Sequence, residues 1–183
     1  MKRPLEMAHD FLAQVITKDD VVVDATMGNG HDTLFLAKLA KQVYAFDIQE
    51  QALEKTSQRL QEAGLTNVDL LLQGHETVDQ FATEVKAAIF NLGYLPSADK
   101  SIITKPHTTI EALEKLCQML VKGGRIAIMI YYGHEGGDIE RDAVMDYVSQ
   151  LPQQEYTATI YRTLNQINNP PFLVMIEKLE RYR

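Results

Sequence analysis

The stretch Asp24-Ala25-Thr26-Met27-Gly28-Asn29-Gly30 decides how the rest of this chain is interpreted. It continues the apolar run Val21-Val22-Val23, which predicts a buried strand, and it precedes a predicted helix that begins near Asp32. Two glycines separated by one residue let the backbone approach a ligand that a side chain would hold away. This order of strand, glycine turn and helix is typical of nucleotide-binding folds. The alternative is a tight turn that binds nothing.

The spacing within this turn indicates which nucleotide it suits. A dinucleotide fingerprint has a third small residue three positions after its second glycine, where this chain has Thr33. Asp24, four residues before the first glycine, instead suits a ligand with a cationic amino-acid tail. Together these features resemble motif I of the S-adenosylmethionine-dependent methyltransferases. Besides Asp24, the candidate contacts for the methyl donor in this turn are Met27, Gly28, Asn29 and Gly30.

Length and composition indicate an ordinary globular protein. The 183 residues predict one domain over 1–183, with 45% hydrophobic and 23% charged residues. No apolar stretch approaches the roughly 20 residues that span a bilayer, and Glu6, His9 and Asp10 interrupt any signal-peptide core. Cys117 is the only cysteine, which excludes an intramolecular disulfide and a cysteine-rich metal site. We expect a cytoplasmic protein with no metal and no membrane segment.

The hydrophobic pattern predicts alternating strands and helices that end in two consecutive strands. The predicted strands cover residues 20–24, 42–47, 68–73, 87–91, 125–131, 156–163 and 172–179. The predicted helices lie near residues 5–15, 32–40, 49–63, 110–120 and 144–151. The last two strands have no helix between them, so they form an antiparallel hairpin. We therefore predict an α/β fold of the Rossmann-like class I methyltransferase type, a doubly wound seven-stranded sheet closed by that hairpin.

Ligands of doubly wound sheets lie at the carboxyl ends of the strands, where the winding reverses. Asp47 ends the second predicted strand, seventeen residues after Gly30, and its carboxylate can accept both hydroxyls of a ribose. Gln49 can flank the same ribose, while Gly74 and His75 lie where an adenine edge would bind. The alternatives are a strand-end cap for Asp47 and a surface-loop position for His75.

The reaction centre is predicted at Asn91-Leu92-Gly93-Tyr94, which ends the fourth strand. It resembles the Asn-Pro-Pro-Tyr motif IV of amino-group methyltransferases, with Leu-Gly in place of Pro-Pro. Methyl transfer from a sulfonium is an in-line displacement, so catalysis consists mostly of positioning an amine lone pair. Asn91 can hold the hydrogens of the amine, and the ring of Tyr94 can stabilise developing positive charge. The alternative is an asparagine that caps a turn, with Tyr94 in the core.

Several further residues of the same predicted edge, His31 and His107 among them, are candidates for a catalytic role. Asp32 and Tyr131 could each take a proton or line the pocket of the acceptor. For Asp32 the alternative is that of a helix N-cap. The sequence does not select one proton acceptor.

Three blocks together, 24–33, 91–96 with Asp99-Lys100, and 131–137, resemble a bacterial family formerly called "putative rRNA methylase". Its members have since been linked to transfer RNA, where they add the final methyl group of 5-methylaminomethyl-2-thiouridine at the wobble position. The resemblance covers the whole chain and implies that S-adenosylmethionine is the methyl donor. It further implies an RNA-binding enzyme of tRNA modification that acts on the anticodon loop of tRNA and forms a homodimer.

The net charge of −7 argues against wholesale nucleic-acid binding, but it leaves room for a local basic surface. Four basic residues are predicted on or near the active edge of the sheet, namely Lys100, Lys105, Arg141 and Arg162. The alternative is that each is an ordinary solvated surface residue. Other functions remain open at this point. They are a methyltransferase for ribosomal RNA or for a small-molecule amine, a nicotinamide-dependent oxidoreductase, and a binding module without catalysis.

Overall fold

The computed structural model describes residues 1–93 and 105–180. Its α-helices are α1 (Pro4–Ala13), α2 (His31–Leu39), α3 (Glu50–Ala63), α4 (Pro106–Met119) and α5 (Gly137–Ser149), and η1 (His75–Gln80) is a 3-10 helix. The strands are β1 (Val21–Asp24), β2 (Gln42–Asp47), β3 (Val68–Leu72), β4 (Val85–Leu92), β5 (Leu120–Ile130), β6 (Tyr156–Tyr161) and β7 (Phe172–Lys178).

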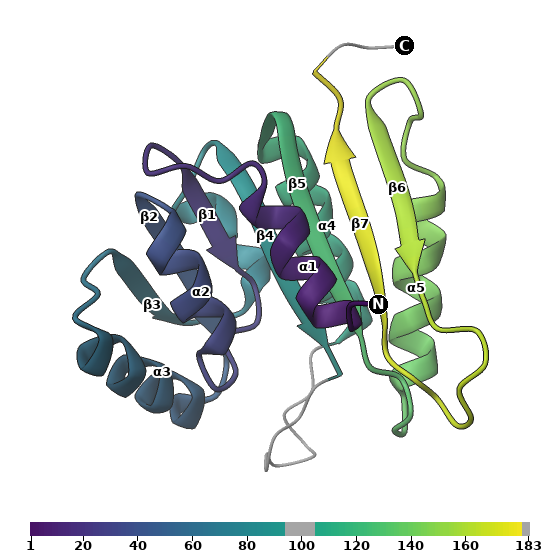
Figure 1. Ribbon diagram of the computed structural model, residues 1–183, viewed down its shortest axis with the longest axis horizontal. Coiled ribbons are helices and arrows are strands. Elements are labelled where there is room, and N and C mark those ends of the chain that lie inside the picture. The colour runs from purple at the N-terminus through teal and green to yellow at the C-terminus, as the bar shows by residue number, and fades with distance from the viewer. Residues whose placement is uncertain (94–104, 181–183) are drawn as a thin grey trace.

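The seven strands form one sheet in the order β3-β2-β1-β4-β5-β7-β6 (Figure 1). Strands β1 to β5 are parallel, whereas β7 is antiparallel to both β5 and β6. The winding reverses between β1 and β4, which are neighbours in the sheet although two strands separate them in the sequence. The predicted fold class is confirmed, including the antiparallel C-terminal pair.

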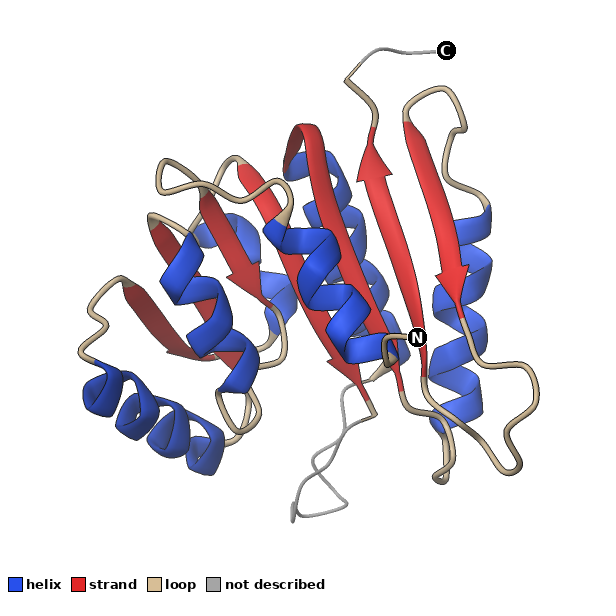
Figure 2. Cartoon of the chain, viewed as in Figure 1, coloured by secondary structure: helices blue, strands red, loops and turns tan. Residues whose placement is uncertain are grey.

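Helices cover both faces of the sheet (Figure 2). On one face α1, α2 and α3 bury Leu12, Leu36 and Leu60 against the sheet, and on the other η1, α4 and α5 bury a second cluster that includes Phe46 and Phe90. Strand β4 is apolar through its centre because a parallel strand covered by helices on both faces has no exposed side. No helix in the described part of the chain is long and apolar enough to cross a membrane.

Four local predictions differ from the structure. Helix α5 begins at Gly137 rather than near residue 144, because its first turn lacks the apolar spacing of its later turns. Strand β5 begins at Leu120 rather than at residue 125 and passes through Gly123-Gly124, where a side chain at Gly124 would collide with the backbone of β4. The 3-10 helix η1 was not predicted, because its six residues have no helical periodicity to detect. Helix α2 has Gly30 as its N-cap, in the left-handed conformation with φ 87°. The interpretation of Asp32 as an N-cap is therefore wrong.

Helix α1 is tied to the sheet at both of its ends. Arg125 of β5 donates from Nη1 to the carbonyl of Phe11 at 2.8 Å, and its guanidinium lies 4.5 Å from the centre of the Phe11 ring. The hydroxyl of Tyr161 donates to the carbonyl of Lys2 at 2.6 Å. These contacts place the start of α1 beside the edge at which the parallel strands end (Figure 1).

Candidate functional site

The ends of β1 and β4 meet at the point where the winding of the sheet reverses. The backbone N–H of Asn91 donates to Oγ1 of Thr26 at 2.6 Å, which joins the segment after β1 to the end of β4. Ligands of doubly wound folds bind outside such a junction. The predicted donor turn and the predicted reaction centre are therefore neighbours in space.

Asp24 is buried at this junction and holds the segment after β1 against the start of α2. Its carboxylate accepts a hydrogen bond from the hydroxyl of Thr33 at 2.6 Å and one from the N–H of Thr26 at 3.2 Å. Burial, and after it the negative charge of Asp32, raise the pKa of Asp24 well above its ordinary value. Because the side chain has no exposed surface, Asp24 acts on the site through Thr26 and Thr33 in this conformation. Its contact with the tail of a donor stays a prediction.

The two glycines of the turn are required for different reasons. A Cβ at Gly30 would lie 2.9 Å from the Cα of Thr56, so Gly30 allows close packing against α3. Gly28, at φ 56°, would direct a Cβ into open space with only the carbonyl of Thr26 within 4 Å. Between them, the carbonyl of Asn29 accepts from Nε of Arg59 at 2.6 Å. Gly28 is thus the glycine that leaves room for a ligand, while the neighbouring Met27 is buried.

Asp47 ties the glycine turn to β2. One carboxylate oxygen accepts from the N–H of Gly28 at 3.1 Å, and the other accepts from the N–H of Gln49 at 3.0 Å. The strand-end role is therefore present, but the half-buried side chain also faces a cavity of about 270 Å³. Each carboxylate oxygen has a second lone pair, so Asp47 can also accept from a ribose.

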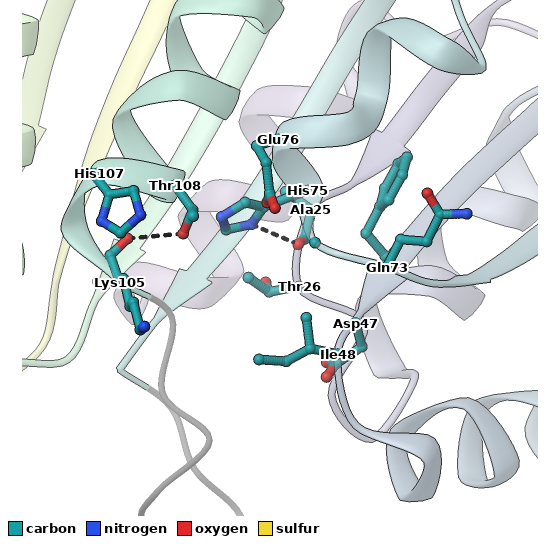
Figure 3. A pocket seen from close by; sticks show the side chains of 12 residues that line it. Ala25, Thr26, Asp47, Ile48, Gln73, His75, Glu76, Lys105, His107 and Thr108 are labelled. Carbon is teal, nitrogen blue, oxygen red and sulfur yellow. Dashed lines mark hydrogen bonds between the residues drawn. The ribbon is translucent and has the colours of Figure 1, made fainter.

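Figure 3 shows this first cavity, which is lined by the segments that follow β1 and β3, by the end of β2, by η1 and by the start of α4. Asp47 and Ile48 lie on one side, and Lys105, His107 and Thr108 lie on the other. The cavity is predominantly apolar with a few polar groups at its rim, as expected for a binding site of a nucleoside.

His75 closes the inner end of this cavity. Its Nδ1 lies 2.9 Å from the carbonyl of Ala25, and its ring centre lies 5.5 Å from that of Phe90. Burial lowers the pKa of His75, which favours the neutral imidazole with Nδ1 as the donor to Ala25. The alternative of a surface-loop histidine is wrong, because the residue is only 4% exposed. Gly74 precedes it in the cavity wall.

Asp32 joins Asn91 to a residue that the sequence did not single out for the site. Its Oδ2 accepts from the side-chain amide of Asn91, and its Oδ1 lies 2.6 Å from Nε2 of His9. Asp32 is only 6% exposed, so Asn91 and His9 provide the hydrogen bonds that water would otherwise make to its carboxylate. His9 gave no local signal, because it lies on another helix and is separated from Asp32 by 23 positions in the sequence.

Comparison with known proteins places the chain in a family. The model of the family described as "Putative rRNA methylase" matches residues 43–177. A chloroplastic tRNA (mnm(5)s(2)U34)-methyltransferase of Arabidopsis thaliana is 37% identical over 97% of this chain and 70% of its own length. The chain belongs to this methyltransferase family.

Solved structures agree with the family assignment. A crystal structure of a methyltransferase from Streptococcus mutans in complex with SAH is 58% identical, with a TM-score of 0.93 over 98% of this chain and 99% of that one. A Clostridium thermocellum protein described as an rRNA methylase is 42% identical, with a TM-score of 0.94 over 98% and 99% of the two chains. This methyltransferase therefore uses S-adenosylmethionine, of which SAH is the demethylated product.

The residues present fit that donor. The open space beside Gly28, the spare lone pairs of Asp47 and the apolar cavity closed by His75 can accept an amino-acid tail, a ribose and an adenine. The individual contacts predicted for Asp24, Met27, Asn29, Gly30, Gln49 and Gly74 stay predictions.

The predicted acceptor side of the methyltransferase is at the ends of β4 and β5. Gly93 has φ 80°, and a Cβ there would collide with the carbonyl of Tyr131. The positive φ explains why glycine stands at the position of the second proline of the motif, since proline cannot adopt a positive φ. Tyr131 also lines a second cavity of about 970 Å³ between α1 and the end of β6. Tyr94, the predicted aromatic partner of Asn91, lies outside the described residues.

Proposed function

We propose that this methyltransferase N-methylates 5-aminomethyl-2-thiouridine at the wobble position of tRNA and so forms 5-methylaminomethyl-2-thiouridine. The observation that carries the proposal is the likeness, over 97% of this chain, to the Arabidopsis thaliana tRNA (mnm(5)s(2)U34)-methyltransferase. The hydrogen-bonded pair of Asp32 and Asn91 supports it, because an amide oxygen beside a buried carboxylate suits an amine acceptor.

The second cavity supports a nucleic-acid acceptor. Its walls combine aromatic rings with positive charge, which suits an unstacked base and its phosphates. Arg162 is exposed there and has no ion-pair partner within the described ranges. By contrast, Lys2 pairs with Asp10 and Arg3 pairs with Glu6. We infer that Tyr131 stacks on the base and that Arg162 contacts the backbone of the anticodon loop.

The bound S-adenosylmethionine supplies a methyl group on a sulfonium, and the new N–C bond forms as the S–C bond breaks and sulfur keeps its electron pair. In the proposed mechanism Asp47 holds the ribose and the turn at Gly28 admits the methionine portion. Asn91 donates an amide N–H to Asp32, and its amide oxygen has no partner in the described part of the chain, so this oxygen can accept a hydrogen of the amine and aim the lone pair of the amine. Positioning of this kind is the main contribution that a protein makes to an in-line transfer.

The test is the nucleoside composition of tRNA from a deletion strain. We expect mass spectrometry to show accumulated 5-aminomethyl-2-thiouridine and loss of its methylated product. The gene for the wild type, but not that for Asn91→Ala, should restore the product. Purified protein with S-adenosylmethionine should then methylate the tRNA of the deletion strain in vitro. Unchanged tRNA nucleosides in the deletion strain would contradict the proposal.

The family description favours one second candidate, which is methylation of ribosomal RNA. The same strains decide between the two, because ribosomal RNA should keep every methylated nucleoside if tRNA is the substrate. A methylated nucleoside that is missing only from ribosomal RNA would establish the second candidate instead.

A further inference from the structure

Helix α1 brings His9 into the wall of the second cavity and, through Asp32, close to Asn91. Its Nε2 lies 2.6 Å from Oδ1 of Asp32. Its ring stacks on Phe35 of α2, with ring centres 4.0 Å apart and planes inclined by 7°. The side chain keeps 26% exposure and lines the second cavity. Two contacts from α2 thus fix the ring while part of it stays open to the acceptor side.

The contact with Asp32 determines which ring nitrogen of His9 is free. An ionised carboxylate only accepts hydrogen bonds, so Nε2 carries the hydrogen and donates. In the neutral imidazole the lone pair then belongs to Nδ1. Nδ1 has no hydrogen-bond partner among residues 1–93 and 105–180. A base held by a buried carboxylate, with its second nitrogen free, is the arrangement that activates nucleophiles in other enzymes.

We propose that His9 is the general base that removes a proton from the acceptor amine through Nδ1. The inference rests on the proposed function, since an amine that arrives protonated has no lone pair with which to attack. One proton passes from the ammonium nitrogen to Nδ1, and the electrons of that N–H bond stay on nitrogen as the lone pair used in the transfer. Asp32 balances the charge of the imidazolium, which afterwards releases its proton to water through the second cavity.

The charged groups around His9 come from α1, from α2 and from the walls of the second cavity. Asp32 is the anion in direct contact with the ring, and the buried Asp24 lies behind it. On α1, Asp10 is paired with Lys2, so its charge is largely compensated. The second cavity also contains other charged or titratable groups, which are the amine of Met1 and the side chains of Lys2, Arg3, Glu6, Tyr131, Tyr161 and Arg162.

The first test compares the wild type with His9→Gln in single turnovers at saturating donor. Glutamine keeps an amide donor for Asp32 but cannot take a proton. We expect the rate at neutral pH to fall by about 100-fold or more, which is the usual contribution of a general base. The loss should shrink at alkaline pH, where water removes the proton from the amine. Ala13→Gln, at an exposed position of the same helix that lines neither cavity, is the matched control and should keep the wild-type rate.

The second test does not depend on turnover. The ¹⁵N chemical shifts of the imidazole at mildly alkaline pH should show hydrogen on Nε2 and a lone pair on Nδ1 for the resonance that is lost in His9→Gln. The variant Asp32→Asn should mix the two tautomers, because an amide can donate as well as accept. Hydrogen on Nδ1 in the wild type would overturn the proposal.

Two kinetic results would also overturn the proposal. The first is a single-turnover rate of His9→Gln that falls by the same factor at every pH. The second is an unchanged rate at saturating donor, whether or not the donor binds more weakly. An unchanged rate together with a weaker affinity for the donor would assign the pair of His9 and Asp32 to donor binding. A wild type that does not methylate this tRNA would contradict the proposed function instead, and the tautomer measurement would still decide whether His9 has a free lone pair.

Discussion

Asp47→Ala provides the sharpest test of how this methyltransferase holds its donor. The change removes a half-buried carboxylate that accepts from the N–H groups of Gly28 and Gln49 and that, in the proposed complex, also accepts from the ribose. A hydrogen bond to a charged group contributes about 1.5–3 kcal/mol. Since about 1.4 kcal/mol corresponds to tenfold in affinity, the Kd for S-adenosylmethionine should rise about 10- to 150-fold.

The same substitution leaves two backbone N–H groups without their acceptor, so a cost in stability is expected as well. Because both groups are only partly buried and water can reach them, we expect the free energy of unfolding to fall by about 1–2 kcal/mol. Isothermal titration calorimetry with S-adenosylmethionine measures the affinity, and urea unfolding of the same preparations measures the stability.

Asp69→Ala is the matched control. Asp69 lies on the neighbouring strand β3, is exposed, and pairs in register with Tyr44 rather than with the turn. Asp69→Ala changes the net charge by the same amount as Asp47→Ala but should leave the Kd for S-adenosylmethionine unchanged. A donor affinity in Asp47→Ala that equals the wild-type value, in protein that is folded by its urea transition, would refute the reasoning. An equal loss in Asp69→Ala would assign the effect to net charge.

Three further changes test other parts of the site. Gly93→Ala should lower the free energy of unfolding in urea by at least about 2 kcal/mol more than Gly136→Ala does. Both glycines have φ 80°, but only a side chain at Gly93 would collide with the backbone of Tyr131. Equal losses of unfolding free energy in the two variants would exclude the collision as the cause. Asn91→Ala should lower the single-turnover rate by about 100-fold while calorimetry shows an unchanged donor Kd, and a weaker Kd with a normal rate would contradict its role. Burial lowers the pKa of His75, so as the pH falls the unfolded chain takes up a proton before the folded chain does. The contribution of the neutral imidazole to the free energy of unfolding is therefore fully present above about pH 6.5 and is lost at lower pH. The difference in unfolding free energy between the wild type and His75→Gln should narrow as the pH falls below 6.5, and a constant difference would argue against a buried neutral imidazole.

Much of the fold follows from local patterns in the sequence. Apolar runs and helical spacing locate each predicted strand and α-helix, but β5 begins at Leu120 rather than at residue 125, and α5 begins at Gly137 rather than near residue 144. Gly64 ends α3 in the left-handed conformation expected of a C-cap. The start of β5 was missed because glycines normally indicate a turn, whereas Gly124 is accommodated inside a strand by close contact with the backbone of β4.

The candidate site divides in the same way. The glycine turn and Asp47 are visible in the sequence, because a strand that ends at a ligand leaves its signature within a few residues. The burial of Asp24 and the packing of Gly30 against Thr56 are invisible there, since both depend on what α3 and β4 bring from elsewhere in the chain.

The amino-acid sequence by itself thus determined an alternating α/β chain, a turn suited to S-adenosylmethionine and the strand end at Asn91. Only the tertiary structure decided that β7 lies between β5 and β6 and that His9 contacts Asp32. The physical reason is range. Periodicity and turn chemistry act over a few residues, whereas the contact between α1 and α2 forms only after both helices have packed on the same face of the completed sheet.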